Sequence, residues 1–179
     1  MIHSPEHSSQ YRKVAGRARS KIAAAFISGV ILAANPADAQ QVSSTGVKTL
    51  SPQGAIKPTG TWNLATRAGD FIFIAGMRGI DPKTDRLIPG HEARIRQAFL
   101  NMKLIAESEG ASLHDAVRLV VFVTDMFRFR PVVNKVQAEL WGDGPYPPRT
   151  IIEVHRLNQD DIVEVEGTFY VPIARTDDK

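Results

Sequence analysis

The sequence predicts an α+β domain whose β-sheet carries two helices on one face. Three observations support this fold class. Residues 71–76 form a continuous apolar run that is bounded by glycine and too short for a helix, which is typical of a buried strand. Residues 92–109 repeat apolar side chains at three- and four-residue spacing, which indicates an amphipathic helix. Residues 150–157 and 162–171 are rich in β-branched side chains and predict two further strands.

The remaining elements follow from local signals along the chain. The first helix ends before Gly110, a residue suited to a left-handed cap. Residues 117–124 are enriched in Val, Leu and Phe and predict a strand. A second helix is expected to follow Pro131 and to end at Gly142. This order of elements favours both helices on one face of the sheet. The other face then needs cover, which we expect from further subunits in a closed symmetric assembly.

The N-terminal 39 residues have the pattern of a secretion signal. Five basic residues precede an apolar run at 22–34, and the small residues Ala37 and Ala39 flank Asp38 at a cleavage site. The run is shorter than the roughly 20 residues of a membrane span, so no membrane anchor is expected. We therefore expect cleavage near Ala39 and a periplasmic or secreted protein. A misassigned start on a cytoplasmic protein is the alternative.

The segment after the signal is rich in Gln, Ser, Thr, Gly and Pro. Residues 40–58 are therefore predicted to form a flexible lead-in that can contain a short edge strand. The folded domain is expected to cover residues 59–175. Removal of the 39 signal residues from the 179 leaves enough chain for one domain with an adequate core.

Charge and cysteine content exclude several classes of function. The chain has 22 Lys and Arg against 19 Asp and Glu, but the predicted signal holds five of the former and two of the latter. The rest is formally neutral and has no basic stripe with interleaved aromatics, so a nucleic-acid partner is not expected. The absence of cysteine excludes disulfides and thiolate chemistry. The five histidines lack the spacing of metal ligands, so no metal site is expected.

One arginine and one glutamate near the C-terminus are candidates for chemistry. A proline before Arg149 favours extended backbone, so the guanidinium emerges where a strand begins. Its planar fork can hold a carboxylate with two hydrogen bonds. Glu166 alternates with Val163 and Val165 and should face the other side of its strand. Such a pair could bind and hydrolyse a small carboxylated imine, although a solvated surface couple is the plainer alternative.

From about residue 60 to residue 171 the chain resembles the reactive intermediate deaminase family, the Rid or YjgF-type proteins. The resemblance implies a chorismate-mutase-like α+β fold with a mixed sheet, assembled as a homotrimer with ligand clefts between subunits. The strings that carry it are Ala68-Gly69-Asp70-Phe71-Ile72-Phe73-Ile74-Ala75-Gly76, Val121-Phe122-Val123-Thr124-Asp125-Met126, Val133-Asn134, Pro147-Pro148-Arg149-Thr150 and Val163-Glu164-Val165-Glu166.

The resemblance also implies an activity and a set of site residues. Deaminating members hydrolyse enamines and imines such as 2-aminoacrylate to a keto acid and ammonia, without a metal or organic cofactor. By resemblance, Arg149 grips the substrate carboxylate and Glu166 handles water and protons. Gly76 matches the glycine whose backbone lies against the ligand, and Asn134 matches a position near the site. Partial burial of Glu166 would let it exchange protons near neutral pH.

Three positions depart from the pattern of the deaminating members. Trp62 lies near the place of a tyrosine, Ala75 replaces a serine, and Ile151 replaces a frequent cysteine. Together with Gly76 and Asn134 they form the predicted substrate-binding set, which is more apolar than usual. Trp62 can stack on a larger conjugated substrate or serve as simple core.

These departures leave alternatives to a small-substrate deaminase. One is a non-catalytic ligand-binding or chaperone-like trimer, which Trp62 and Ala75 favour. Another is a deaminase of a larger substrate such as 2-aminomuconate. Separately, Arg128 and Arg130 with the neighbouring Phe127 and Phe129 could form a membrane-surface patch or a subunit contact, although a solvated surface is the simpler interpretation.

Overall fold

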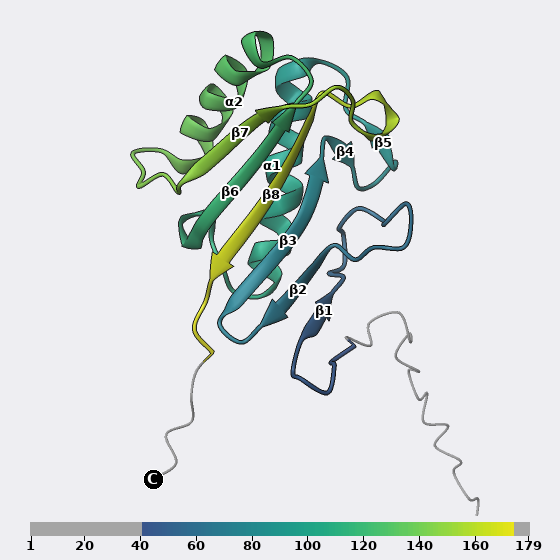
Figure 1. The fold of residues 1–179 in the computed structure, drawn as a ribbon, viewed down its shortest axis with the longest axis vertical. Helices are drawn as coiled ribbons and strands as arrows, with labels where there is room; N and C mark the ends of the chain where they lie inside the picture. Colours follow the sequence, from purple (N-terminus) through teal and green to yellow (C-terminus); the bar gives the residue numbers. More distant parts are fainter. Residues whose placement is uncertain (1–40, 174–179) are drawn as a thin grey trace, which may run out of the picture. The chain divides into compact units, whose positions relative to one another are not determined.

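The computed structural model describes residues 41–173, which form a six-stranded mixed sheet with two helices (Figure 1). The strand order is β1-β2-β3-β8-β6-β7, with only β6 and β7 parallel. The large sheet contains β1 (Lys48–Leu50), β2 (Ala65–Ala68), β3 (Phe71–Arg78), β6 (Ala116–Val123), β7 (Arg149–Glu153) and β8 (Val163–Tyr170). The other elements are β4 (Ile80–Asp81), β5 (Arg86–Leu87), α1 (His91–Ser108), η2 (Leu113–Asp115), α2 (Met126–Trp141) and η3 (Asn158–Asp160). The predicted α+β fold class is confirmed.

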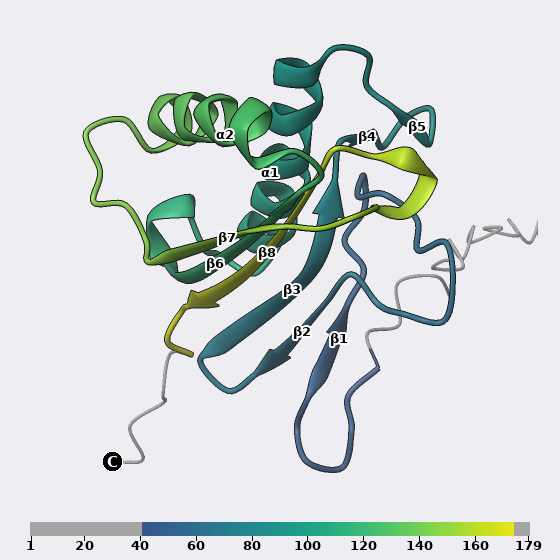
Figure 2. The ribbon, with the colours of Figure 1, turned by 45° about the horizontal axis from the view of Figure 1, so that its top comes forward.

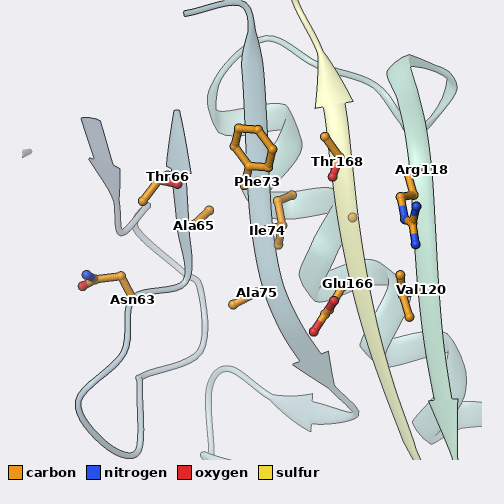
Figure 3. A pocket seen from close by; sticks show the side chains of 11 residues that line it. Asn63, Ala65, Thr66, Phe73, Ile74, Ala75, Arg118, Val120, Glu166 and Thr168 are labelled. Carbon is orange, nitrogen blue, oxygen red and sulfur yellow. The ribbon is translucent and has the colours of Figure 1, made fainter. Parts of the chain in front are cut away.

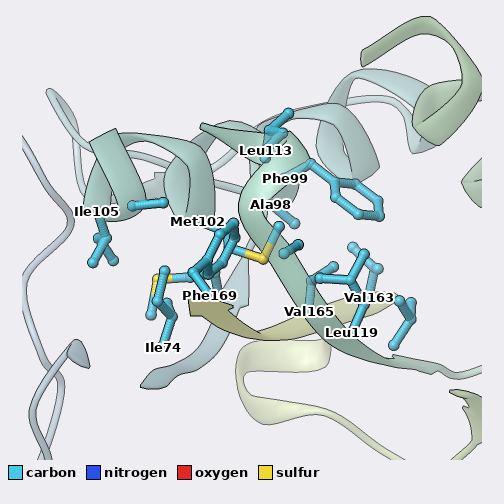
Figure 4. Packing of buried hydrophobic residues seen from close by; sticks show 14 of the residues in the cluster. Ile74, Ala98, Phe99, Met102, Ile105, Leu113, Leu119, Val163, Val165 and Phe169 are labelled. Atoms are coloured by element: carbon cyan, nitrogen blue, oxygen red, sulfur yellow. The ribbon is translucent and has the colours of Figure 1, made fainter. Parts of the chain in front are cut away.

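Both helices cover the same face of the sheet, as predicted (Figure 2). Helix α1 lies on β3 and β8, and α2 lies near β6 and β7. Phe99 and Met102 of α1 pack on Leu119 and Val165 of the sheet, and all four side chains are fully buried (Figure 4). Burial of each such side chain contributes about 1.5–3 kcal/mol. This core fixes which face of each strand points toward the helices.

The face of the sheet away from the helices, here called the open face, carries exposed aromatic side chains. Phe71 and Phe73 of β3 are 41% and 47% exposed, and Tyr170 of β8 is 42% exposed. The rings of Phe71 and Tyr170 lie 5.2 Å apart between centroids. The strand predicted at 71–76 is therefore confirmed, but the prediction that it is buried was wrong for a single protomer. In a single protomer, the side chains of this strand that point to the open face, Phe71 and Phe73, remain exposed.

Helix α2 begins at Met126, five residues before Pro131, whereas the sequence predicted a start after this proline. Two carboxylates make the earlier start possible because they accept hydrogen bonds from backbone amides of the first turn. The Asp125 side chain accepts from the Arg128 amide at 3.0 Å, and the Glu153 side chain accepts from the Met126 amide at 2.7 Å. Pro131 then lies within the helix and lacks one amide donor. The predicted end at Gly142 is confirmed.

The predicted basic and aromatic cluster at the start of α2 lies only partly on the surface. Phe127 is 94% exposed, whereas Phe129 is a core residue with 3% exposure. Arg128 lies over the Phe129 ring at 5.4 Å from its centroid. Arg128 and Arg130 are exposed like Phe127, so only the buried Phe129 is absent from this surface.

Part of the predicted lead-in belongs to the folded domain. It contributes the edge strand β1, and its residues Leu50 and Ile56 are buried in the core. Lys48 of β1 donates to the Glu109 carboxylate at 2.8 Å, which ties the edge strand to the end of α1. The predicted secretion signal at 1–39 lies outside the described residues. Within residues 41–173, no helix has the length and apolar character needed to cross a membrane.

Candidate active site

Arg149 is held at the start of β7 by helix α2. β7 is an edge strand, and Arg149 is in register with the core residue Leu119, so its side chain projects from the helical face. Its Nη1 donates to Gln137 Oε1 at 2.5 Å, and its Nη2 donates to Asn134 Oδ1 at 2.7 Å. Two side chains of the same helix therefore fix the plane of the guanidinium. Sequence analysis identified Asn134 but missed Gln137, which lies one helical turn later on the same side of α2.

The charge of Arg149 is not balanced by a carboxylate. Both of its hydrogen-bond partners are neutral amides, and no ion pair to it forms within residues 41–173. Burial, and then the positive charge of Arg130, lower the pKa of Arg149. The guanidinium opens on a pocket of about 420 Å³, here called the arginine pocket. It is lined by Asn134, Gln137, Ala138, Tyr146, Pro147 and Arg149. A half-buried cation with neutral partners favours binding of an anion.

A second pocket, the sheet-face pocket, lies on the open face and contains Glu166. Glu166 faces away from Val163 and Val165, as predicted, and lies between Ala75 of β3 and Val120 of β6 (Figure 3). The pocket has a volume of about 380 Å³. Its lining is Asn63, Ala65, Thr66, Phe73, Ile74, Ala75, Arg118, Val120, Glu166, Gly167 and Thr168. Glu166 and Ala75 are thus brought together.

The carboxylate nearest Gly76 belongs to Glu164. A Cβ atom on Gly76 would overlap the Glu164 carboxylate and its Cγ, so this side chain lies directly over the glycine backbone. The approach occurs at a bulge in β3, between the registers of Ile74 and Met77. Burial raises the pKa of Glu164; the positive charge of Arg78 opposes this shift, and the negative charges of Glu166 and Asp161 add to it.

The sequence therefore predicted only one of the two candidate glutamates. Glu164 and Glu166 alternate with valines and share the open face, so periodicity alone does not separate them. The proton-handling role of Glu166 stays a prediction, and Glu164 joins it as a candidate. The signal that could have found Glu164 was Gly76, because a residue without a side chain leaves space for a neighbouring group.

The predicted site residues do not form a single cluster in one protomer. Arg149 and Asn134 line the arginine pocket on the helical side, whereas Ala75 and Glu166 line the sheet-face pocket on the opposite side. Ile151 lies two residues after Arg149 on the helical side, packed against the core. Trp62 is partly buried against the core and lines neither pocket. The core interpretation of Trp62 thus agrees with its packing.

Comparisons with known proteins agree with the fold and the motifs. The family model for endoribonuclease L-PSP matches residues 52–171. A probable translation initiation inhibitor from Rhodopseudomonas palustris has a similar structure, with 55% identity, a TM-score of 0.70, and coverage of 72% of this chain and 100% of that one. RidA from an Antarctic Psychrobacter is 35% identical with a TM-score of 0.65, over 69% of this chain and 98% of that one.

A curated relative with a named activity is more distant. The 2-iminobutanoate/2-iminopropanoate deaminase of Salmonella typhimurium is 30% identical over 121 residues, which cover 67% of this chain and 94% of the relative. The family match covers the folded domain from residue 52 to residue 171. The chain therefore belongs to the endoribonuclease L-PSP family, the Rid or YjgF-type proteins that its motifs resemble.

Proposed function

We propose that the protein hydrolyses small carboxylated enamines and imines to a keto acid and ammonia, without a cofactor. The observation that carries this proposal is the half-buried Arg149, whose only partners within residues 41–173 are the neutral amides of Gln137 and Asn134. An arginine has five N–H donors, and two are used here, which leaves three for a substrate carboxylate. The named activity of the Salmonella typhimurium relative supports the same chemistry.

We further propose that two copies of the chain complete each site within a homotrimer. Arg149 and the glutamates occupy opposite faces of one sheet, so one protomer does not bring them to one substrate. The open face also carries Phe71, Phe73 and Tyr170, which a second copy would cover. In this arrangement Arg149 of one subunit lies opposite Gly76 and the glutamates of its neighbour.

The chemistry then needs only positioning and proton transfer. Arg149 holds the substrate carboxylate, and an imine carbon is already electrophilic, so water adds to it when the two are aligned. A neighbouring glutamate in its carboxylate form takes a proton from the water. The protonated form gives this proton to the imine nitrogen, and the product of the addition is a carbinolamine. The glutamate then carries the proton of the new hydroxyl group to the nitrogen, the C=O bond of the keto acid forms, and the C–N bond breaks to release ammonia. Because burial raises the pKa of Glu164, both forms of this side chain are accessible nearer neutral pH.

The direct test of this proposal is release of keto acid and ammonia from imino acids that an amino-acid oxidase generates in place. The purified chain is expected to accelerate the hydrolysis of 2-iminopropanoate above the uncatalysed rate. A rate equal to the uncatalysed one for both small and conjugated substrates would contradict the proposal that the protein is an enzyme. Binding of a keto acid without turnover would instead support the ligand-binding trimer.

The two glutamates are expected to differ in their effect on this reaction. Glu164→Gln should lower kcat/KM about 100-fold, because it removes the buried acid and base. Glu166→Gln should lower it about tenfold or less, since the carboxylate that lies over Gly76 is that of Glu164. The two variants are matched in charge and size, and the measurement is the rate with 2-iminopropanoate. The reverse order of effects would restore Glu166 as the acid and base.

A second candidate substrate class is a conjugated amino acid with two carboxylates, such as 2-aminomuconate. Arg130 favours it, because this residue lies one helical turn before Asn134 and its charge acts on Arg149. Arg130→Gln is then expected to lower kcat/KM for the dicarboxylate by up to about fivefold, the scale of an exposed ion pair. The rate with 2-iminopropanoate should stay unchanged. Equal effects on both substrates would remove this candidate.

A further inference from the structure

Arg78 is a buried arginine beside the candidate site that the proposed chemistry leaves without a role. It ends β3 and is only 5% exposed. Arg78 is the direct cross-strand partner of Glu164, and the neighbouring pair, Met77 and Val165, points into the core. Because directly paired residues share a face, Arg78 and Glu164 both lie on the open face. The pair of Arg78 and Glu164 adjoins Gly76.

A local loop holds the Arg78 guanidinium in place. Its Nη1 donates to the Asn158 carbonyl oxygen at 2.7 Å and to Gln159 Oε1 at 3.0 Å. Gln159 and Asp160 both have left-handed backbone, with φ of 58° and 53°. Such a conformation is unfavourable for a non-glycine residue. The loop that holds the Arg78 guanidinium therefore keeps two residues in an unfavourable backbone conformation.

Part of the Arg78 guanidinium still faces solvent. Within residues 41–173, the Nε and Nη2 atoms of Arg78 donate no hydrogen bond. In the same range, every fully buried side-chain nitrogen or oxygen has a hydrogen-bond partner. Both nitrogens must therefore reach the solvent, although the side chain as a whole is almost completely buried.

Arg78 is the cation among the groups that face Glu164. Glu166 on the same strand and Asp161 in the preceding loop are both acidic. The Asp161 carboxylate is fully buried, where it accepts from the Gly79 and Ile162 amides and pairs with Arg94 at 3.8 Å. On the other side, β6 places the uncharged Phe122 opposite Glu164. Arg78 therefore opposes two negative charges.

We propose that Arg78 is a positioning residue that keeps the Glu164 carboxylate charged and in place over Gly76, and so sets the pH range in which the site works. This inference rests on the function proposed above. Burial raises the pKa of Glu164 and the Arg78 charge opposes the rise. Loss of the Arg78 charge removes the opposing effect, so the pKa of Glu164 would rise further and the pH profile of kcat/KM would move upward.

The test follows the titration of Glu164 directly, by ¹³C NMR of protein labelled at glutamate carboxyl groups and assigned with Glu164→Gln. Arg78→Gln is expected to move the Glu164 midpoint upward by about one pH unit, the low end for a nearby charge. Arg78→Lys keeps the charge and should leave the midpoint close to that of the wild type. Arg86→Gln removes an exposed arginine of β5 and is the control for net charge. The pH profile of kcat/KM should move with the midpoint.

A second variant covers the case in which Arg78→Gln does not fold. Gln159→Gly removes one acceptor of Arg78 and suits the left-handed backbone, so it keeps the fold. It should move the Glu164 midpoint upward by less than Arg78→Gln. If Arg78→Gln folds, an unchanged Glu164 midpoint in this variant would overturn the inference. If Arg78→Gln does not fold, an unchanged Glu164 midpoint in Gln159→Gly would overturn it. If the Glu164 midpoint moves but neither the wild type nor any variant hydrolyses imines, the proposed function fails, whereas the link between Arg78 and Glu164 stands.

Discussion

Arg149→Ala is expected to lower kcat/KM for 2-iminopropanoate about 1,000-fold while the protein remains folded. Removal of one partner of a desolvated charge pair costs 2–5 kcal/mol, and about 4 kcal/mol corresponds to this factor. The fold should survive because Arg149 lies at the start of an edge strand and forms no ion pair within residues 41–173. The measurement is the rate of ammonia and keto-acid release, with thermal unfolding as the check of folding.

Two controls separate carboxylate binding from a general effect of the substitution. Arg149→Lys keeps the charge but loses the planar fork, so it should recover only part of the rate. An imine without a carboxylate should be hydrolysed equally by the wild type and by Arg149→Ala, since the lost contact is absent from that substrate. A similar loss on both imines would show that Arg149 acts on the structure of the site and not on the substrate carboxylate.

The sequence predicts the position of Arg149 better than its surroundings. The preceding proline and the apolar strand are local signals, and they place the guanidinium at the start of β7, where the structure has it. Gln137 lies within the helix predicted after Pro131, but the local pattern does not show that its side chain faces Arg149 on β7. The start of α2 was also predicted too late. The carboxylates of Asp125 and Glu153 allow the earlier start, and Glu153 reaches the helix from a strand 27 residues away in the sequence. Local patterns do not contain such a contact.

The separation of Arg149 from the glutamates depends on sheet topology. β8 is the last strand in the chain, yet it lies between β3 and β6 in the middle of the sheet. Alternation correctly predicted that Glu166 faces away from its neighbouring valines, but alternation does not say whether that face or the other meets Arg149. The choice between Glu164 and Glu166 likewise depends on a bulge in β3, because the bulge brings the Gly76 backbone under Glu164.

Gly76→Ala is expected to lower kcat/KM about 1,000-fold, although it adds only one methyl group. The new Cβ would occupy the space of the Glu164 carboxylate and Cγ, so the glutamate must rotate away from the site. Displacement of an acid and base by about 1 Å costs roughly 100-fold. The methyl group also covers the backbone that the family resemblance places against the ligand, and this accounts for the remaining part of the loss in kcat/KM. The measurement is kcat/KM with 2-iminopropanoate.

A double-mutant cycle with Glu164→Ala tests the cause. If Gly76→Ala acts mainly by displacing Glu164, the activity losses of the two single variants will not add in the double variant. The double variant should also unfold at a higher temperature than Gly76→Ala alone, because truncation of Glu164 removes the overlap. Ala75→Gly, one residue away, serves as the control for an altered backbone in the same bulge. Fully additive losses would mean that Gly76 and Glu164 act independently, and the assignment of Glu164 would then lose its geometric support.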